Sequence, residues 1–188
     1  MAFNHLVLIG GGHSNVSLLK KWLMFPKLMP EIPVSIISRD SHLVYSAMFP
    51  SVISKSISLE ESLIDIKSLA KNAKVSFIEE LKDIDFNLRK IILSNRPAVN
   101  YSKLVLNYGS QTVIPKEFES LVKNRNAFSI KPFLSAYDSI QKEDIYDSVN
   151  ERPFVIVGSG LAAIEVSYAL RKRWRDRPLT IMSSKKNK

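Results

Sequence analysis

Two short glycine-rich segments hold the residues whose types and spacing point most directly to chemistry. The first, Gly10-Gly11-Gly12-His13-Ser14, follows an apolar run that begins at His5, and the second, Gly158-Ser-Gly160, follows Phe154-Val-Ile-Val157. In each, one glycine permits a sharp turn, and the glycine two positions later lets backbone amides approach a phosphate at a helix N-terminus. One such turn is weak evidence, because an ordinary strand-to-helix turn has the same composition. Two of them in matching context predict two dinucleotide sites.

The positions around each turn either follow the dinucleotide pattern G-x-G-x-x-G or depart from it. The third glycine is Asn15 in the first turn and Ala163, an accepted substitute, in the second. An acid usually follows the next strand and binds the adenosine ribose, but Ser38 and Arg39 stand there. The nearest acid, Asp40, either reaches the ribose from the loop or is a solvated turn residue.

The composition excludes several kinds of chemistry. The chain has 188 residues and no cysteine, which rules out disulfides, thiolate catalysis and cysteine-ligated metals. Its three histidines have no metal-ligand spacing, so we expect no metal site. No apolar run approaches the length of a membrane span or has the basic flank of a signal peptide, and we expect a cytoplasmic protein. Because the chain has no cysteine, a redox function would need a bound cofactor.

The net charge of +9 is concentrated at the C-terminal end. Residues 171–188 hold eight Lys or Arg and one Asp, so +7 of the net charge lies there. The segment from Arg171 to Arg177 includes Trp174 and has two interpretations. It either contacts nucleic-acid phosphates and bases, or forms the solvated last turn of a helix. A basic patch alone is weak evidence for nucleic-acid binding, and we expect no nucleic-acid partner.

The elements that position the first turn form a strand, helix and strand. Apolar residues at 16, 19 and 22 or 23 predict a helix that ends by Pro26, and residues 34–37 predict the second strand. Residues 41–57 are expected to form a loop with many apolar side chains. Ser58 and Glu61 form a capping box, which predicts a helix bearing apolar residues at 59, 63, 66 and 69.

The rest of the chain alternates in the same way. Residues 75–78 predict another buried strand, residues 81–85 and 88–93 an antiparallel pair, and residues 101–109 a strand that stops at a glycine. Residues 132–141 predict a helix and residues 179–182 the strand that closes a second strand-helix-strand unit. The fold class is therefore α/β: a Rossmann-like half-domain with an antiparallel β meander, then the first βαβ of a second Rossmann-like domain.

These segments together resemble the FAD-dependent pyridine nucleotide oxidoreductases with two dinucleotide-binding domains. Within them the chain is similar to the type II NADH dehydrogenase-like group, and most closely to the flavoprotein module fused to selenide, water dikinase. The resemblance rests on residues 8–14, 45–50, 64–66, 101–110 and 158–165. The Tyr-Ser-x-Met-x-Pro segment at 45–50 is the most group-specific of these.

The resemblance implies a set of cofactor-binding residues and no particular catalytic residue. Residues 10–14 would hold the FAD pyrophosphate, the segment from Tyr45 to Pro50 would lie near the isoalloxazine ring, and Leu81 would offer its backbone to the adenine. His13 could equally be a plain helix-start residue, and Tyr45 a core residue. The remaining implied cofactor positions are Ser38 and Arg39, Gly109 of the motif that closes the first half of the FAD domain, and Gly158, Gly160, Ala163 and Glu165 at the NAD(P)H turn.

The resemblance also implies a domain order and an activity. An FAD-binding part would cover residues 1–115, a connecting segment 116–151, and the start of an NAD(P)-binding domain 152–188, so the chain would be the N-terminal portion of a family member. Hydride would pass from NAD(P)H to FAD and on to an acceptor such as a quinone. A link to selenide, water dikinase, peripheral membrane contact and a homodimer are left open, as is a non-catalytic nucleotide-binding fragment or interaction module. Ser183, Ser184, Lys185 and Lys186 could suit the 2′-phosphate of NADPH or belong to a solvated tail.

Overall fold

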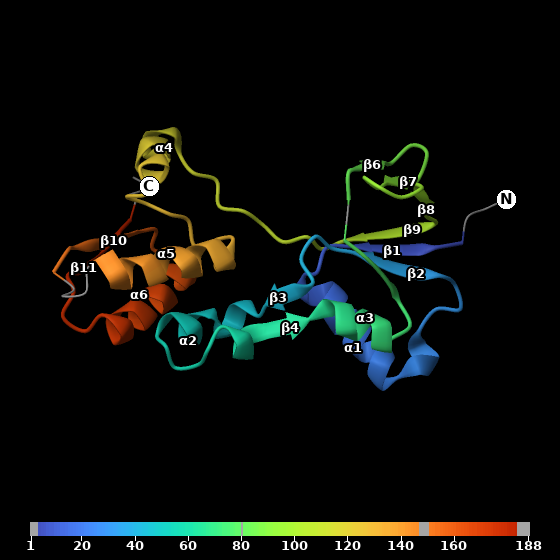
Figure 1. Cartoon of the computed structure of the whole chain (residues 1–188), viewed down its shortest axis with the longest axis horizontal. Helices are drawn as coiled ribbons and strands as arrows, with labels where there is room; N and C mark the ends of the chain where they lie inside the picture. The colour runs from blue at the N-terminus through green and yellow to red at the C-terminus, as the bar shows by residue number, and fades with distance from the viewer. Residues whose placement is uncertain (1–3, 80, 147–150, 184–188) are drawn as a thin grey trace, which may run out of the picture. The chain divides into compact units, whose positions relative to one another are not determined.

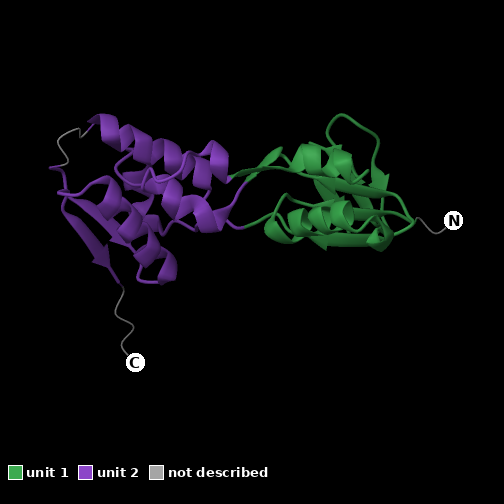
Figure 2. Cartoon of the chain, turned by 90° about the horizontal axis from the view of Figure 1, so that it is seen from below, with its two compact units in different colours: residues 1–43, 63–109 green, residues 44–62, 110–188 purple. Residues whose placement is uncertain are grey.

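The chain forms two compact units. The computed structural model describes residues 4–79, 81–146 and 151–183, traced from the N-terminus in Figure 1. Unit 1 comprises residues 1–43 and 63–109, and unit 2 comprises residues 44–62 and 110–188 (Figure 2). Each unit is therefore built from two separate stretches of the chain.

A four-stranded parallel sheet forms the centre of unit 1. Its strands lie in the order β5 (Ser76–Ile78), β2 (Val34–Ile37), β1 (Leu6–Ile9) and β9 (Lys103–Leu106). Leu6 of β1 is opposite Val34 on one side and Lys103 on the other. Strands β1 and β2 are buried throughout, as their largely apolar sequences predict for strands covered on both faces, although β2 includes the buried Ser35. The α/β class is confirmed.

Two helices cover one face of this sheet and a small meander covers the other. Leu6 and Leu8 pack with residues of α1 (His13–Met24) and α3 (Ile66–Asn72). Val7 and Ile9 point to the opposite face, where they pack with residues of the antiparallel meander. The meander consists of β6 (Asp83–Asp85), β7 (Lys90–Ile92) and β8 (Val99–Asn100). The predicted helix after the glycine turn and the predicted antiparallel pair of strands are both confirmed.

The ends of α1 follow from local sequence. Gly12 is the N-cap in an extended conformation, and the helix ends at Met24 before the short 3-10 helix η1 (Pro26–Leu28). Val16, Leu19 and Trp22 are buried, whereas Leu23 is exposed, which resolves the alternative at the last apolar position. The prediction that Pro26 stops the helix is confirmed.

The predicted helix beginning at Ser58 is wrong. The capping box itself forms, since the Ser58 amide donates to Glu61 Oε2 and the Glu61 amide donates to Ser58 Oγ. Only the 3-10 turn η3 (Glu60–Ser62) follows, and the chain then enters β4 (Leu63–Asp65), which forms a two-stranded sheet with β3 (His42–Val44). Asp65 caps the separate helix α3 by accepting from the Ser68 amide. The apolar spacing was thus shared between two elements.

Unit 2 combines helices with a two-stranded parallel sheet. Its elements are η2 (Ser46–Met48), α2 (Phe49–Ile53), α4 (Lys116–Lys123), α5 (Phe133–Tyr146), β10 (Phe154–Val157), α6 (Leu161–Arg173) and β11 (Leu179–Met182). The predicted loop over residues 41–57 therefore contains a strand and a helix, because Phe49, Val52 and Ile53 are buried. The predicted helix at 132–141 and the strands at 154–157 and 179–182 are confirmed.

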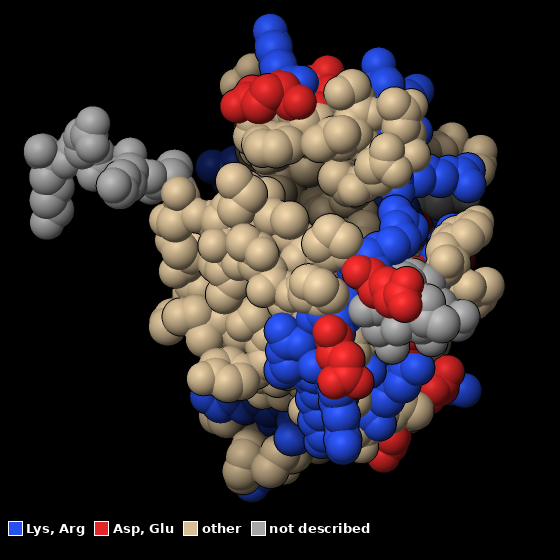
Figure 3. Space-filling view, turned by 90° about the vertical axis from the view of Figure 1, so that its left-hand side faces the viewer, with Lys and Arg blue, Asp and Glu red and all other residues tan. Residues whose placement is uncertain are grey.

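Unit 2 leaves many apolar side chains exposed around its sheet. On β10, Val155 and Val157 are exposed, and on α6, Leu161 and Tyr168 are 81% and 75% exposed. The view of Figure 3 faces unit 2 and shows a broad area without charge beside a region where Lys and Arg gather. Among the described residues, no helix is long and apolar enough to cross a membrane, and no group of acids and histidines could hold a metal ion.

His5 gives unit 1 a dependence on pH. Its ring Nε2 lies 3.0 Å from Ser35 Oγ on β2, and burial lowers the pKa of His5 below the usual value. The unfolded chain takes up the proton near pH 6.5 while the folded chain resists it, so we expect the free energy of unfolding to fall as the pH drops below about 6.5. Urea unfolding at pH 7.5 and pH 5.0 should show a smaller decrease for His5→Gln than for the wild type. His42→Gln, at an exposed position, should retain the full decrease.

Candidate dinucleotide site

The first glycine turn connects the end of β1 to helix α1. Gly10 has a φ of +89°, a conformation that residues with a side chain rarely adopt, and its amide donates to Ile37 O at 2.7 Å. Gly12 then begins α1 with an extended backbone. The turn thus places a helix N-terminus at the carboxyl edge of the parallel sheet, where ligands of open α/β sheets bind.

The backbone after β9 packs so closely on this turn that two of its glycines are required. A Cβ atom added to Gly10 would overlap the backbone of Asn107 and Tyr108, and one added to Gly12 would overlap Asn107. A Cβ at Gly11 would meet the Ile66 side chain and lie 3.1 Å from Ser38 Oγ. The structure therefore brings Ser38, predicted at the ribose position, beside the glycine turn.

Asn15, which replaces the third glycine, has a structural role that the sequence did not indicate. Its side chain is fully buried, and its Nδ2 donates to Ile9 O at 3.2 Å and to Gly10 O at 2.8 Å. These bonds tie the first turn of α1 to the end of β1. A glycine here normally serves close packing of helix on strand, and Asn15 joins the two by hydrogen bonds instead.

The other unit 1 candidates lie at the ends of strands. Arg39 and Asp40 are exposed and form an ion pair with each other at 3.4 Å, and Ser38 Oγ donates to Asp40 O. Leu81 is exposed just before β6, and Gly109, after β9, has a φ of +83°. The structure gives His13 and Ser14 as the first two residues of α1, both exposed.

The second glycine turn repeats the backbone geometry of the first. Gly158 has a φ of +126°, and its amide donates to Met182 O at 2.8 Å, as the Gly10 amide donates to Ile37 O. Gly160 begins α6 with φ −73° and ψ 172°, against −69° and 171° for Gly12. Unlike the first turn, Gly158 and Gly160 have no atom within 4 Å of an added Cβ in the part of the chain that the structure describes. The two glycine turns thus have the same backbone geometry, and the second is less closely surrounded by other residues.

The remaining candidates of the second turn surround its helix start. The Ala163 amide donates to Gly160 O within the first turn of α6, and Glu165 is exposed. Ser159 Oγ lies 2.8 Å from Ser183 Oγ, which joins the glycine turn to the end of β11. Ser183 is exposed, while Ser184, Lys185 and Lys186 lie outside the described residues.

The segment from Tyr45 to Pro50 leads into helix α2. The Tyr45 amide donates to Ser62 O, and the Met48 amide donates to Tyr45 O, so the segment forms a tight 3-10 turn. Tyr45 is 36% exposed, and Pro50 stands in the first turn of α2, where its missing amide costs nothing. This segment has more apolar residues than an ordinary loop because several of them, such as Phe49, are buried and hold α2 in place.

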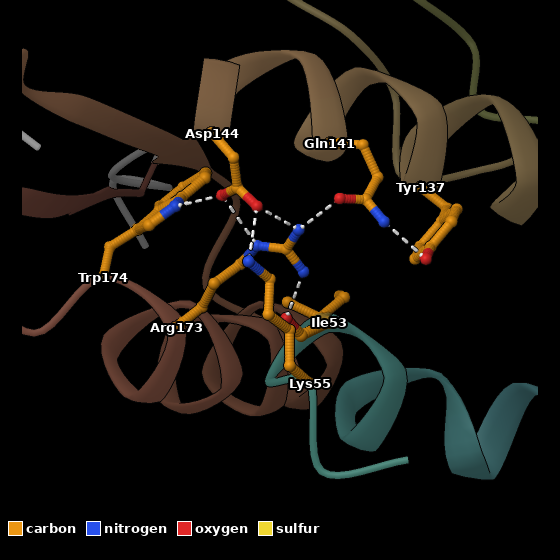
Figure 4. Close-up of polar contacts among 7 residues, drawn as sticks. All are labelled: Ile53, Lys55, Tyr137, Gln141, Asp144, Arg173 and Trp174. Atoms are coloured by element: carbon orange, nitrogen blue, oxygen red, sulfur yellow. Dashed lines mark hydrogen bonds and ion pairs between the residues drawn. The ribbon is translucent and has the colours of Figure 1, made fainter. Parts of the chain in front are cut away.

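A polar cluster in unit 2 was missed from the sequence. Arg173, at the end of α6, donates to both carboxylate oxygens of Asp144, at 3.0 and 2.7 Å, and to Ile53 O at the end of α2 (Figure 4). Lys55 and the Trp174 indole also donate to Asp144. Burial alone would raise the pKa of Asp144, but these donors outweigh it and hold the pKa well below its usual range.

Arg177 adds a second buried ion pair to the same segment. Its guanidinium donates to Glu143 Oε2 at 2.7 Å and lies 4.4 Å from the centre of the Trp174 ring. The side chains of Arg173 and Arg177 are each 1% exposed. Neither the nucleic-acid interpretation nor the solvated-turn interpretation of the segment holds for these two arginines, and their partners on α5 could be identified only from the fold.

Two βαβ units that each carry a glycine turn place the chain in the class of dinucleotide-binding α/β proteins. The pattern of the pyridine nucleotide-disulphide oxidoreductase family matches residues 4–183. The chain belongs to this family, which consists of FAD-containing, NAD(P)H-using oxidoreductases. No curated protein matches the sequence.

Solved structures share the fold. The sulfide:quinone oxidoreductase of Aquifex aeolicus is 23% identical with a TM-score of 0.74, and it matches 96% of this chain over 43% of its own length. Plasmodium falciparum NDH2, solved with NADH, is 15% identical with a TM-score of 0.69, and it matches 96% of this chain over 42% of its own length. The water-forming NADH oxidase of Lactobacillus brevis, also solved with NADH, is 15% identical with a TM-score of 0.65, and it matches 96% of this chain over 39% of its own length. The chain thus spans less than half the length of these structures.

Replacing Arg173 should destabilise unit 2. Arg173→Ala leaves Asp144 and Ile53 O without their main donor, and we expect a loss of about 3 kcal/mol in the free energy of unfolding, the low end for a broken buried ion pair. The neighbouring Lys172→Ala removes one exposed hydrogen bond to Ser56 and should cost less than about 1 kcal/mol. Urea unfolding followed by tryptophan fluorescence in a Trp22→Phe background, which leaves Trp174 as the reporter, measures both. Equal losses would show that the Asp144 cluster contributes nothing specific.

Proposed function

We propose that this chain contributes the FAD site and the beginning of the NAD(P)H site of an FAD-dependent NAD(P)H oxidoreductase of the NADH dehydrogenase-like type. In this proposal residues 1–115 bind FAD, residues 116–151 connect, and residues 152–188 begin the NAD(P)-binding domain. The observation that carries the proposal is the repeated βαβ turn, with the same backbone hydrogen bond at Gly10 and Gly158. Membership of the family supports the same cofactors.

The first turn has the composition of a diphosphate site. Its three consecutive glycines carry no side chain, and Gly12 begins α1, so the turn places a helix N-terminus at the carboxyl edge of the sheet, where ligands of such sheets bind. Gly10, Gly11, Gly12, His13 and Ser14 would hold the diphosphate. Ser38, beside Gly11, and Arg39, two residues after β2, are the proposed ribose contacts, and Leu81 and Gly109 complete the unit 1 set.

The second turn would hold the nicotinamide nucleotide. Gly158, Gly160 and Ala163 are the proposed diphosphate contacts, with Glu165 one turn further along α6. Ser183 stands where NAD-binding relatives carry an acid, and its position beside Ser159 makes NADH and NADPH both candidates. The segment from Tyr45 to Pro50 is the proposed neighbour of the flavin ring.

FAD bound in unit 1 would supply the hydride acceptor, and the protein's part would be to bind and orient the two cofactors. The chain has no cysteine, so no disulfide of its own can relay electrons, which favours direct transfer to an acceptor. A quinone-like acceptor is proposed because similar folds occur in a sulfide:quinone oxidoreductase and in NDH2. A functional link to selenide, water dikinase rests on the sequence resemblance alone.

A second candidate function is an interaction module without catalysis. The observation that favours it is the set of exposed apolar side chains on β10, α6 and β11, including Val157, Leu161, Tyr168 and Met182. Apolar surface of this kind is typical of protein contacts. Retention of FAD by the purified chain and oxidation of NAD(P)H favour the oxidoreductase, and binding of neither cofactor at saturating concentration favours the module.

The first turn should be specific for FAD. Gly12→Ala introduces a Cβ that overlaps Asn107, and we expect FAD affinity to fall at least about tenfold, measured by quenching of flavin fluorescence. Gly160→Ala places a Cβ in open space and should leave FAD affinity unchanged. Equal FAD affinity for both variants would place the flavin elsewhere.

The second turn should be specific for the nicotinamide nucleotide. Gly158→Ala forces a side chain into a φ of +126°, so we expect affinity for NADH or NADPH to fall about tenfold while FAD affinity is unchanged. Isothermal titration with each nucleotide measures the loss and identifies the preferred one. A parallel fall in FAD affinity would instead indicate a general loss of folding.

A further inference from the structure

Helix α1 begins at a residue that has no side chain to cap it. The first amides of a helix have no partner within the helix, and an N-cap side chain usually accepts from the second or third of them. Here Gly12 is the N-cap, so these amides, which belong to Ser14 and Asn15, need an acceptor from elsewhere.

Asn107 supplies that acceptor from the end of the neighbouring strand β9. Its Oδ1 accepts from the Ser14 amide at 3.0 Å and from the Asn15 amide at 3.4 Å. The backbone of Asn107 adds two bonds, because its O accepts from the Gly12 amide at 2.9 Å and its amide donates to Ile9 O at 2.7 Å. One residue after β9 therefore connects the end of β1, the glycine turn and the first turn of α1.

Among the described residues, no side chain caps the second glycine turn. Gly160 begins α6 with nearly the same backbone angles as Gly12, yet no atom of the described residues lies within 4 Å of the position that its Cβ would take. At Gly12 that position is occupied by Asn107 Oδ1. The cap is thus a property of the first site and not of glycine turns in this chain generally.

We infer that Asn107 is a positioning residue for FAD: its carboxamide caps α1 from β9 and holds the glycine turn in the shape that receives the diphosphate. The inference rests on the proposed FAD site in unit 1. A neutral amide suits this place, because it accepts from both amides without adding charge. A carboxylate would make the same bonds but repel a diphosphate bound at the same helix end.

Two substitutions separate the cap from the charge. Asn107→Ala removes the acceptor, so the Ser14 and Asn15 amides should exchange with solvent about fivefold faster, the Tm of unit 1 should fall by about 4–8 °C, and FAD should bind about fivefold more weakly. Asn107→Asp keeps the acceptor, so exchange should be no faster and Tm no lower than in the wild type, while FAD binds about tenfold more weakly. Asn87→Ala, in an exposed turn of the meander, should change none of these.

Amide exchange by NMR, thermal unfolding and flavin fluorescence titration measure these effects on the full chain. Unchanged exchange in Asn107→Ala, tighter FAD binding by Asn107→Ala, or wild-type FAD affinity in Asn107→Asp would each overturn the inference. If the wild type itself binds no FAD, the proposed function fails, and the exchange of Ser14 and Asn15 still decides whether Asn107 is the cap.

Discussion

Unit 1 depends on the close parallel pairing of β1 with its two neighbours in the sheet. The last residue of β2 accepts from Gly10, and Asn107 after β9 accepts from Gly12, so the glycine turn is held from both sides. Because Asn107 and Tyr108 approach so closely, no side chain fits at either glycine. The parallel strands also direct their carboxyl ends to one edge, which is why Ser38 and Asn107, far apart in the sequence, meet at the same turn.

Unit 2 has the same kind of glycine turn, but different contacts hold the elements around it. Its glycine turn has the same backbone hydrogen bond, but β10 pairs only with β11 among the described residues, and Val155, Val157 and Leu161 remain exposed. The end of α6 is instead fixed by buried ion pairs to α5, through Arg173 with Asp144 and Arg177 with Glu143.

The fold determines what the chain can contribute to redox chemistry. It has no cysteine, although its family is named for oxidoreductases that act on disulphides, and its described residues contain no metal cluster. What it offers is backbone geometry at two helix N-termini and side chains that fix that geometry. The proposed FAD and NAD(P)H sites thus call for binding and orientation rather than for a reactive side chain.

The sequence by itself determined the two glycine turns, the strands beside them and the end of α1 at Pro26, because backbone sterics and runs of apolar residues act locally. It misassigned residues 58–69, where one apolar spacing is divided between β4 and α3. Only the tertiary structure showed that Asn15 is tied to β1, that Asn107 caps α1, and that Arg173 and Arg177 are buried. For Asn107 and the two arginines the partners lie about 30 or more residues away, and for Asn15 the bonds depend on how α1 packs on β1. Such contacts form when elements pack together, and no local pattern encodes them.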